Sequence, residues 1–272
     1  AEATRLHTKW RGSTFMPAIG VASSDASVAE AQADVFAAQG HYAQAEPLFR
    51  RAVAAVAGHP VLARLSWHDY LRGRLAEVLV RQGRHLEAEG EARAALLQSL
   101  RARGRNAAPT ANALIVLAYA LAEQGRFAEV EALARAALDI HEKAGTSSDS
   151  LMLAVARVQL GASLAMQGRW RDTLAVYETV RAAATGDPEA FARYLPAESI
   201  WAMALLETGE VDRALDLLHA ALARSQRAGE QYLSTAQVRG LLGMAYLAKG
   251  DLERALEEFE AAAPLLIKPS YE

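Results

Sequence analysis

The side chains best suited to chemistry in this chain are its seven histidines, because the sequence contains no cysteine. They stand singly, at His7, His41, His59, His68, His85, His141 and His219. No two of them are four residues apart on one helix face and no His-Glu-x-x-His motif occurs, so we expect no zinc site. The lack of cysteine also excludes thiolate ligands, disulfides and a cysteine nucleophile.

Motifs that bind nucleotides or activate a serine are absent as well. The chain has no Gly-x-Ser-x-Gly elbow, no phosphate-cradling loop and no dinucleotide fingerprint. Acidic runs such as Glu257-Glu258 and Glu260 are typical of a solvated helix face. We therefore expect no catalytic residues, no metal and no cofactor, and a protein that is not an enzyme.

The glycines instead mark the ends of helices that recur at a nearly constant interval. The turn glycines are Gly40, Gly83, Gly125, Gly168, Gly209 and Gly250. Their spacings are 43, 42, 43, 41 and 41 residues, and a fixed period of this kind indicates a repeat array. A small residue stands seven positions before each glycine, at Ala33, Ala76, Ala118, Gly161, Ala202 and Gly243. Small residues there let two helices approach closely.

The stretch from Leu241 to Ala262 shows the unit most clearly. It predicts two amphipathic helices joined at Gly250, with Leu242, Gly243 and Tyr246 facing Ala255, Phe259 and Ala262. This pattern resembles the tetratricopeptide repeat (TPR). The resemblance implies an all-α fold, a right-handed α-α superhelix (TPR solenoid) of six helix-turn-helix repeats.

The long period and one local motif narrow the resemblance. A standard TPR has about 34 residues, whereas these repeats resemble the longer ones of kinesin light chains and of bacterial multi-repeat proteins. YAQAEPLFRRA at 42–52 and Gly58-His59-Pro60 are similar to that subfamily's helix and loop motifs.

The expected domains are an irregular N-terminal arm over 1–26 and the six-repeat superhelix over 27–272. The arm carries Gly12, Pro17 and Gly20 without helical periodicity, and Trp10, Phe15 and Met16 would anchor it. The last helix ends in Leu265, Leu266 and Ile267 with no polar cap. We interpret this end as the site of a partner, of a homodimer contact, or of a further domain of the same chain.

Charge and hydropathy exclude two classes of partner. The net charge of −3 gives no global attraction to nucleic acid, although residues 41–105 hold eleven arginines against six acidic residues. The cluster Arg101, Arg103, Arg105 is interpreted as a solvated helix end, with a patch for an anionic partner as the alternative. No apolar run reaches the ~20 residues of a membrane span. We expect a cytoplasmic protein.

The remaining candidate site is a surface. In TPR arrays the first helix of each pair lines a concave groove, and transfer of the exposed positions predicts a groove that is polar and aromatic at its start and apolar in repeats four to six. The partner-binding residues expected there are Tyr70, Glu77, Arg81, Asn112, Ile115, Tyr119, Val155, Val158, Met166, Ser199, Met203, Gln237 and Met244. The cationic residues of a chaperone-type carboxylate clamp are missing, so we expect a protein or peptide segment with apolar anchors.

The leading hypothesis is a non-catalytic protein-protein interaction scaffold. By resemblance, it would be the sensor or substrate-recognition region of a larger bacterial regulatory protein, for example one with a C-terminal CHAT caspase-like peptidase. Two alternatives stay open: a peptide or small-ligand receptor whose superhelix changes curvature on binding, and a structural oligomerisation module.

Overall fold

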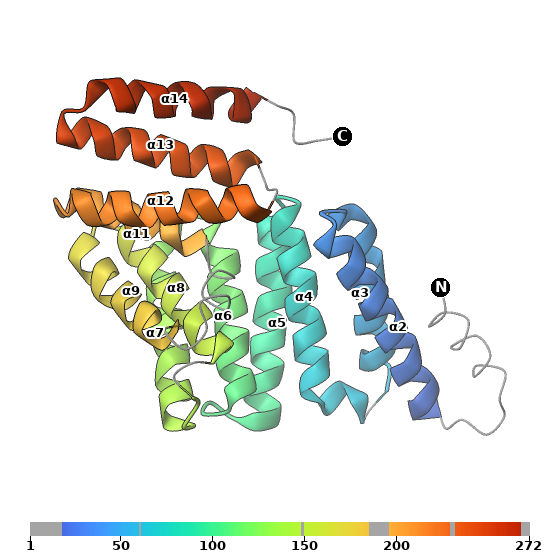
Figure 1. Ribbon diagram of the computed structural model, residues 1–272. Helices are drawn as coiled ribbons and strands as arrows, with labels where there is room; N and C mark the ends of the chain where they lie inside the picture. The colour runs from blue at the N-terminus through green and yellow to red at the C-terminus, as the bar shows by residue number, and fades with distance from the viewer. Residues whose placement is uncertain (1–17, 60, 148–149, 185–195, 229–231, 268–272) are drawn as a thin grey trace. The chain divides into compact units, whose positions relative to one another are not determined.

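The computed structural model describes residues 18–59, 61–147, 150–184, 196–228 and 232–267 (Figure 1). All regular structure in these stretches is helical, which confirms the all-α fold class. The helices are α2 (Ala18–Ala38), α3 (Tyr42–Ala57), the short 3₁₀ helix η1 (Leu62–Arg64), α4 (Ser66–Arg81), α5 (His85–Arg103), α6 (Ala108–Ala122), α7 (Phe127–Lys143), α8 (Leu151–Ala165), α9 (Trp170–Ala184), α11 (Pro196–Glu207), α12 (Val211–Ala228), α13 (Tyr232–Lys249) and α14 (Leu252–Ile267).

Each predicted turn glycine ends the first helix of a pair. All six have positive φ angles, between 73° at Gly125 and 82° at Gly209. At Gly83 the amide donates to the Val80 carbonyl at 2.9 Å and the next amide, of Arg84, donates to the Leu79 carbonyl at 3.0 Å. This left-handed cap satisfies the last carbonyls of the first helix and starts the second helix two residues later. The glycine period therefore predicts the starts of the second helices to the residue.

The N-terminal boundary was predicted incorrectly. Helix α2 begins at Ala18, so residues 18–26 are helical and not part of an irregular arm; Trp10, Phe15 and Met16 lie outside the described residues. Ala26, Ala29 and Ala33 are fully buried at helical spacing. Their period is hard to see in the sequence because alanine contributes little hydrophobic contrast and Ser23-Ser24-Asp25 is typical of a loop.

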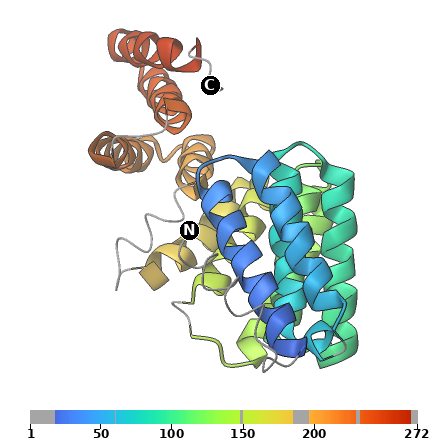
Figure 2. The same ribbon diagram turned by 90° about the vertical axis from the view of Figure 1, so that its right-hand side faces the viewer.

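Contacts between helices divide the chain into two compact units, Ala1–Ser147 (unit 1) and Ser148–Glu272 (unit 2). In unit 1 each helix packs on the next along the chain, and the first helices α4 and α6 also touch each other. Figures 1 and 2 show these helices antiparallel to their chain neighbours. Trp67 Nε1 of α4 donates to Glu30 of α2 at 2.7 Å, so α2, α4 and α6 form one layer.

Unit 2 contains the second set of pairs. Helix α8 packs on α9, α9 on α11, α11 on α12, α12 on α13 and α13 on α14. The first helices α11 and α13 also touch each other. Buried residues form clusters around Leu218 and Leu242 and around Tyr177 and Trp201.

Bulky side chains of second helices lie over glycines of first helices, as the sequence predicts. A Cβ atom added to Gly161 would lie 3.0 Å from Cζ of Tyr177, and one added to Gly243 would lie 2.5 Å from Cε1 of Phe259. Any larger residue at either position would push the two helices of the pair apart or displace the ring.

Candidate interaction site

Polar and aromatic side chains line the first-helix layer of unit 1. Tyr70 is half exposed, and Arg81 is exposed one helical turn beyond the half-buried Glu77. Arg74 forms ion pairs with Glu77 and, at 2.9 Å, with Asp34, and its guanidinium lies 5.6 Å from the ring centre of Phe49. These contacts fix the charged groups that surround Tyr70.

Tyr119 continues this layer on α6 and is half-buried. Burial raises the pKa of Tyr70 and of Tyr119, so both phenols stay protonated and can donate a hydrogen bond to a partner. Asn112 is also half-buried, and its Oδ1 has no hydrogen-bond partner among the described residues. Unit 1 thus offers hydrogen-bonding and aromatic groups.

The first helices of unit 2 expose a different surface, made of methionine. Met203 of α11 is 37% exposed and Met244 of α13 is 46% exposed, and both stand six residues before their turn glycines. Since α11 and α13 are in contact, the two side chains occupy equivalent positions on adjacent helices. Leu247, one turn beyond Met244, is exposed as well.

One position on the α13 face beside these side chains carries no side chain. Gln237, Gly240, Met244 and Leu247 follow one face of the helix, and no described residue lies within 4 Å of the position that a Cβ of Gly240 would occupy. The α13 backbone is therefore bare between Gln237 and Met244. Met166, at the end of α8, is also exposed, whereas Val155, Val158 and Ser199 are half-buried.

Ile115 departs from the expected exposure, because the structure buries it. It stands ten residues before its turn glycine, and the residue at the same position of the preceding repeat is Gly73, whose Cβ would lie 3.3 Å from Val116 of α6. The first helices α4 and α6 therefore approach closely at Gly73, whereas Gly240, at the same position of α13, meets nothing within 4 Å among the described residues. Ile115 itself is 6% exposed, so it cannot reach a partner.

A clasp between consecutive repeats of unit 1 was missed in the sequence. Gln82 donates to Glu46 at 3.1 Å and Arg84 donates to Glu46 at 2.6 Å. One repeat later, Gln124 and Arg126 each donate to Glu89 at 3.0 Å. The signal that could have revealed it is the recurrence of Gln-Gly-Arg, at 82–84, 124–126 and 167–169, with a glutamate six residues after the preceding turn glycine.

The same two carboxylates are held ionised by this clasp. Burial alone would raise the pKa of Glu46, but hydrogen bonds from Arg50, Arg84 and Gln82 outweigh it and hold the pKa below its usual value. The pKa of Glu89 is lowered in the same way, by Gln124, Arg93 and Arg126 against burial. The clasp therefore fixes the register of neighbouring repeats and does not offer free charge for chemistry.

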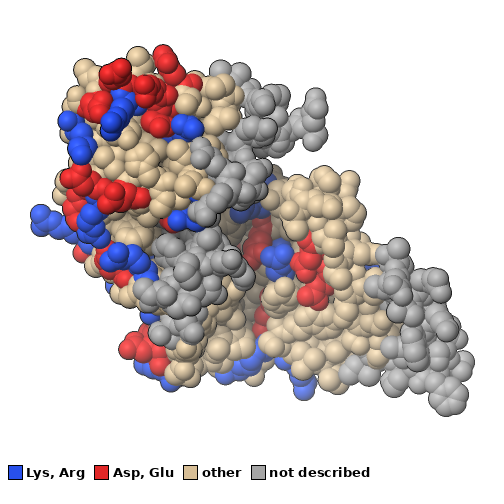
Figure 3. Space-filling model, viewed as in Figure 1, with Lys and Arg blue, Asp and Glu red and all other residues tan. Residues whose placement is uncertain are grey.

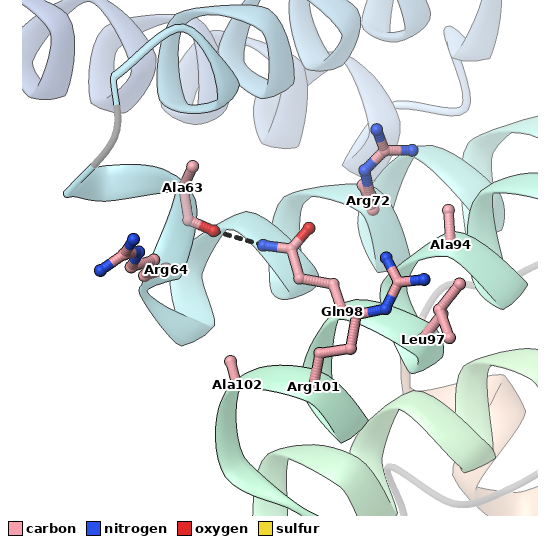
Figure 4. Close-up of a pocket in the computed structure, with 8 residues that line it drawn as sticks. All are labelled: Ala63, Arg64, Arg72, Ala94, Leu97, Gln98, Arg101 and Ala102. Atoms are coloured by element: carbon pink, nitrogen blue, oxygen red, sulfur yellow. Dashed lines mark hydrogen bonds between the residues drawn. The ribbon is translucent and has the colours of Figure 1, made fainter.

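The basic cluster at the end of α5 divides between two roles. Arg103 forms an ion pair with the buried Asp69 of α4, so it is not simply solvated. Arg101 instead lines a pocket of about 590 Å³ between η1, α4 and α5 (Figure 4). The pocket is lined by Ala63, Arg64, Arg72, Ala94, Leu97, Gln98, Arg101 and Ala102. Arg72 already pairs with Glu91, which neutralises part of this basic lining.

Charges in unit 2 are also largely paired. Arg213 bridges Glu210 and, at 2.5 Å, Glu178, while Lys249 pairs with Asp212 at 2.7 Å. Figure 3 shows the resulting mixture of acidic and basic side chains where the helices of this unit turn. Such exposed pairs contribute little stability and leave the methionine surface as the distinctive feature of this unit.

Two further properties concern only the stretches that the structure describes. Their histidine, aspartate and glutamate side chains form no group of three that could hold a metal ion. Among their helices, none has the length and apolar character needed to cross a bilayer.

Two protein-family models match the sequence of this chain. A tetratricopeptide repeat model matches residues 69–143 and 195–268, and a second tetratricopeptide repeat model matches residues 26–51. This chain belongs to the tetratricopeptide repeat family. No curated protein sequence matches it.

Solved TPR structures share its fold at low sequence identity. TPR-like repeats of a putative kinesin light chain from Podosopora anserina are 18% identical, with 74% of this chain and 95% of that chain covered and a TM-score of 0.60. A Rap protein complexed with competence and sporulation factor is 12% identical, with 97% and 69% covered and a TM-score of 0.68. A Pyrococcus horikoshii STAND protein with a tetratricopeptide repeat sensor is 11% identical, with 96% and 38% covered and a TM-score of 0.68.

Proposed function

We propose that this TPR chain is a non-catalytic scaffold that binds a protein segment with apolar anchors on the methionine surface of unit 2, defined by Met203, Met244, Leu247 and Gly240. The observation that carries the proposal is the exposure of Met203 and Met244 at equivalent positions of adjacent first helices. Methionine is flexible and polarizable, so it adapts to differently shaped apolar side chains.

The bare backbone at Gly240 supports the same assignment. A side chain of the partner placed there would contact the α13 backbone directly, with Met244 and Leu247 on one side and Gln237 on the other. Apolar anchors with a few polar contacts are typical of segment recognition by a helical groove. The polar layer of unit 1, around Tyr70 and Tyr119, is the alternative binding surface.

The test uses a display library of random 15-residue peptides selected against the immobilised chain. We expect enrichment of peptides with apolar residues three or four positions apart. The Met203→Glu/Met244→Glu double variant should lose this enrichment, because each glutamate would place a charge against the apolar anchors. The matched control is Ala175→Glu/Ala220→Glu, which alters exposed alanines of the second helices α9 and α12.

Three outcomes decide the proposal. Enrichment that the control retains and the methionine variant loses supports it. No enrichment by the unaltered chain, or equal loss in both variants, contradicts it. If Tyr70→Ala/Tyr119→Ala abolishes enrichment and the methionine variant retains it, the binding surface is that of unit 1 and the proposed site is wrong.

A finer proposal concerns the larger protein. We infer that the chain is the sensor or substrate-recognition region of a longer regulatory protein of the kind with ~42-residue repeats, for example one with a CHAT peptidase. A solved STAND protein provides a precedent, since its tetratricopeptide repeat sensor is part of a longer chain. The gene sequence on both sides of this chain tests the inference: an adjoining effector domain is expected, and its absence overturns it.

A further inference from the structure

Helix α14 exposes a stripe of large apolar side chains. Leu252, Leu256 and Leu266 are 68%, 58% and 60% exposed, and Phe259 is 36% exposed. Their spacing of four, three and seven residues places them on one helix face. Four large apolar residues on one face exceed the isolated exposed leucines that are ordinary on protein surfaces.

In earlier second helices the residues at the same repeat positions are buried. Phe49 and Val56 of α3 correspond to Phe259 and Leu266, and both are buried. Helix α4 packs on α3, and its Arg74 lies over the Phe49 ring. Leu215 and Leu218 of α12 correspond to Leu256 and Phe259, and both are buried where α13 packs on α12. The stripe on α14 is therefore a repeat-stacking face that nothing covers among the described residues.

Helix α2 exposes the complementary half of the same interface. Its exposed residues Ser27, Ala31, Val35 and Ala38 follow one face. Val35 is 57% exposed, whereas Val78, at the same repeat position in α4, is 3% exposed. Arg74 corresponds to Ala31 and lies over the Phe49 ring of the preceding repeat. This face of a first helix is thus the one that a preceding second helix covers.

The side chains of the two exposed faces match each other. Within the chain, the residue nine positions after a turn glycine meets the middle of the next first helix, as Phe49 meets Arg74 and as Tyr177 stacks on Trp201 at 6.2 Å. In an α14–α2 contact, Phe259 would meet the small Ala31. Bulky-on-small packing of this kind already joins Phe259 to Gly243 inside the repeat.

Neither of the two exposed faces carries the charged residue that forms the clasp in unit 1. Leu256 occupies the position of the clasp glutamates Glu46 and Glu89, and His41 occupies the position of the clasp arginines Arg84 and Arg126. An α14–α2 contact would therefore bury neither an unpaired glutamate nor an unpaired arginine. Stacking α14 against a turn that carries the clasp arginine would leave that arginine without its carboxylate.

We propose that two copies of this chain associate head to tail, with the stripe on α14 of one copy packed against the exposed face of α2 of the other. The contact is heterologous, because it joins two different surfaces and leaves one of each free in a dimer. It would extend the repeat stack across two molecules by the same packing that joins α3 to α4 and α12 to α13.

The test compares single-face variants by sedimentation velocity over a range of concentrations. The unaltered 272-residue chain should increase in mass with concentration. Leu256→Glu should weaken association by about 100-fold or more, because the carboxylate would be buried without a partner. Val35→Glu should have the same effect from the α2 side. Both residues are exposed, so thermal unfolding should confirm that each variant folds.

A mixing experiment distinguishes this contact from a symmetric one. Leu256→Glu keeps an intact α2 face and Val35→Glu keeps an intact α14 face, so an equimolar mixture should form dimers and nothing larger. The control Leu86→Glu changes an exposed leucine of α5 outside both faces and should associate normally.

Four results would overturn the proposal. They are a chain that stays monomeric at every concentration, full association of Val35→Glu alone, a mixture without dimers, or equal loss in the Leu86→Glu control. Full association of Val35→Glu would show that α14 pairs with α14.

Discussion

Glycines of the first helices occupy two opposite environments. At Gly161 an added Cβ would lie 3.0 Å from Tyr177, which is 2% exposed and stacked on Trp201. At Gly240 an added Cβ would meet no described residue within 4 Å. Each glycine lowers helix stability by about 1 kcal/mol relative to alanine. Only at Gly161 is this loss offset by packing, because the absence of a Cβ lets Tyr177 approach the helix.

Alanine substitutions should therefore have opposite effects at these two sites. Gly240→Ala should raise the free energy of unfolding by about 0.5–1 kcal/mol, because it gains propensity without a clash. Gly161→Ala should lower it by about 1–3 kcal/mol, because Tyr177 cannot move without disturbing Trp201. Urea unfolding of both variants measures the difference. If Gly161→Ala is as stable as the unaltered chain, the close contact with Tyr177 is wrong.

The sequence predicts such residues only when the partner lies at a fixed repeat offset. Gly161 and Gly243 both stand seven residues before a turn glycine, so their packing on a second helix could be predicted. The close approach at Gly73 and the open space at Gly240 could not, because they depend on whether an adjacent first helix approaches closely. That approach is a property of the assembled repeats and leaves no local pattern.

At the scale of elements, the clasp shows how charge sets the stacking of repeats in unit 1. Each clasp joins the second helix of one repeat to the turn of the next, through Glu46 to Gln82 and Arg84 and through Glu89 to Gln124 and Arg126. The glycine period predicts where the second helices start, but it does not predict which side chains join consecutive repeats. Only the recurrence of Gln-Gly-Arg carries that information.

Removing the clasp carboxylates should lower stability in a pH-dependent way. The pKa values of Glu46 and Glu89 lie below the unfolded value of 4.5, so their contribution is present above pH 4.5 and is lost as the pH falls through the lowered values. Glu46→Gln/Glu89→Gln should cost about 2 kcal/mol at neutral pH. The gap between variant and unaltered chain should close in acid.

Urea unfolding at a series of pH values measures this effect. Glu123→Gln is the control, since Glu123 is exposed and has no ion pair among the described residues. It should leave stability unchanged at every pH. A gap that stays constant from neutral to acid pH would contradict the ionic role of the clasp.

At the scale of the whole molecule, each unit has buried clusters of its own. The cluster of unit 1 includes Leu75 and Leu79, and the clusters of unit 2 include Leu205 and Leu242. The repeat period predicts a continuous array and gives no indication of this division. The boundary falls in the Gly-Thr-Ser-Ser-Asp stretch at 145–149, which the sequence identifies only as another inter-repeat loop.

Cavity-forming substitutions should accordingly act on one unit at a time. Leu75→Ala should lower the stability of unit 1 by about 2–5 kcal/mol, and Leu242→Ala should do the same in unit 2, because both side chains are at most 1% exposed. Hydrogen exchange resolved along the chain should show loss of protection confined to the altered unit. Equal loss in both units would show that the molecule unfolds as one cooperative body.

The identity of the residue six positions after each turn glycine has an evolutionary consequence. Repeats that carry Glu46 or Glu89 stack on an arginine turn, whereas Leu174 and Leu215 stack on turns with Glu210 and Asp251. A gene duplication that copies the α11–α12 pair would therefore insert a repeat compatible with both of its new neighbours. The same copy placed between α3 and α4 would leave Glu46 without an arginine partner, because the copied turn carries a glutamate at the position of Arg84. Duplicated repeats are therefore compatible only with neighbours that carry the same type of residue at these positions.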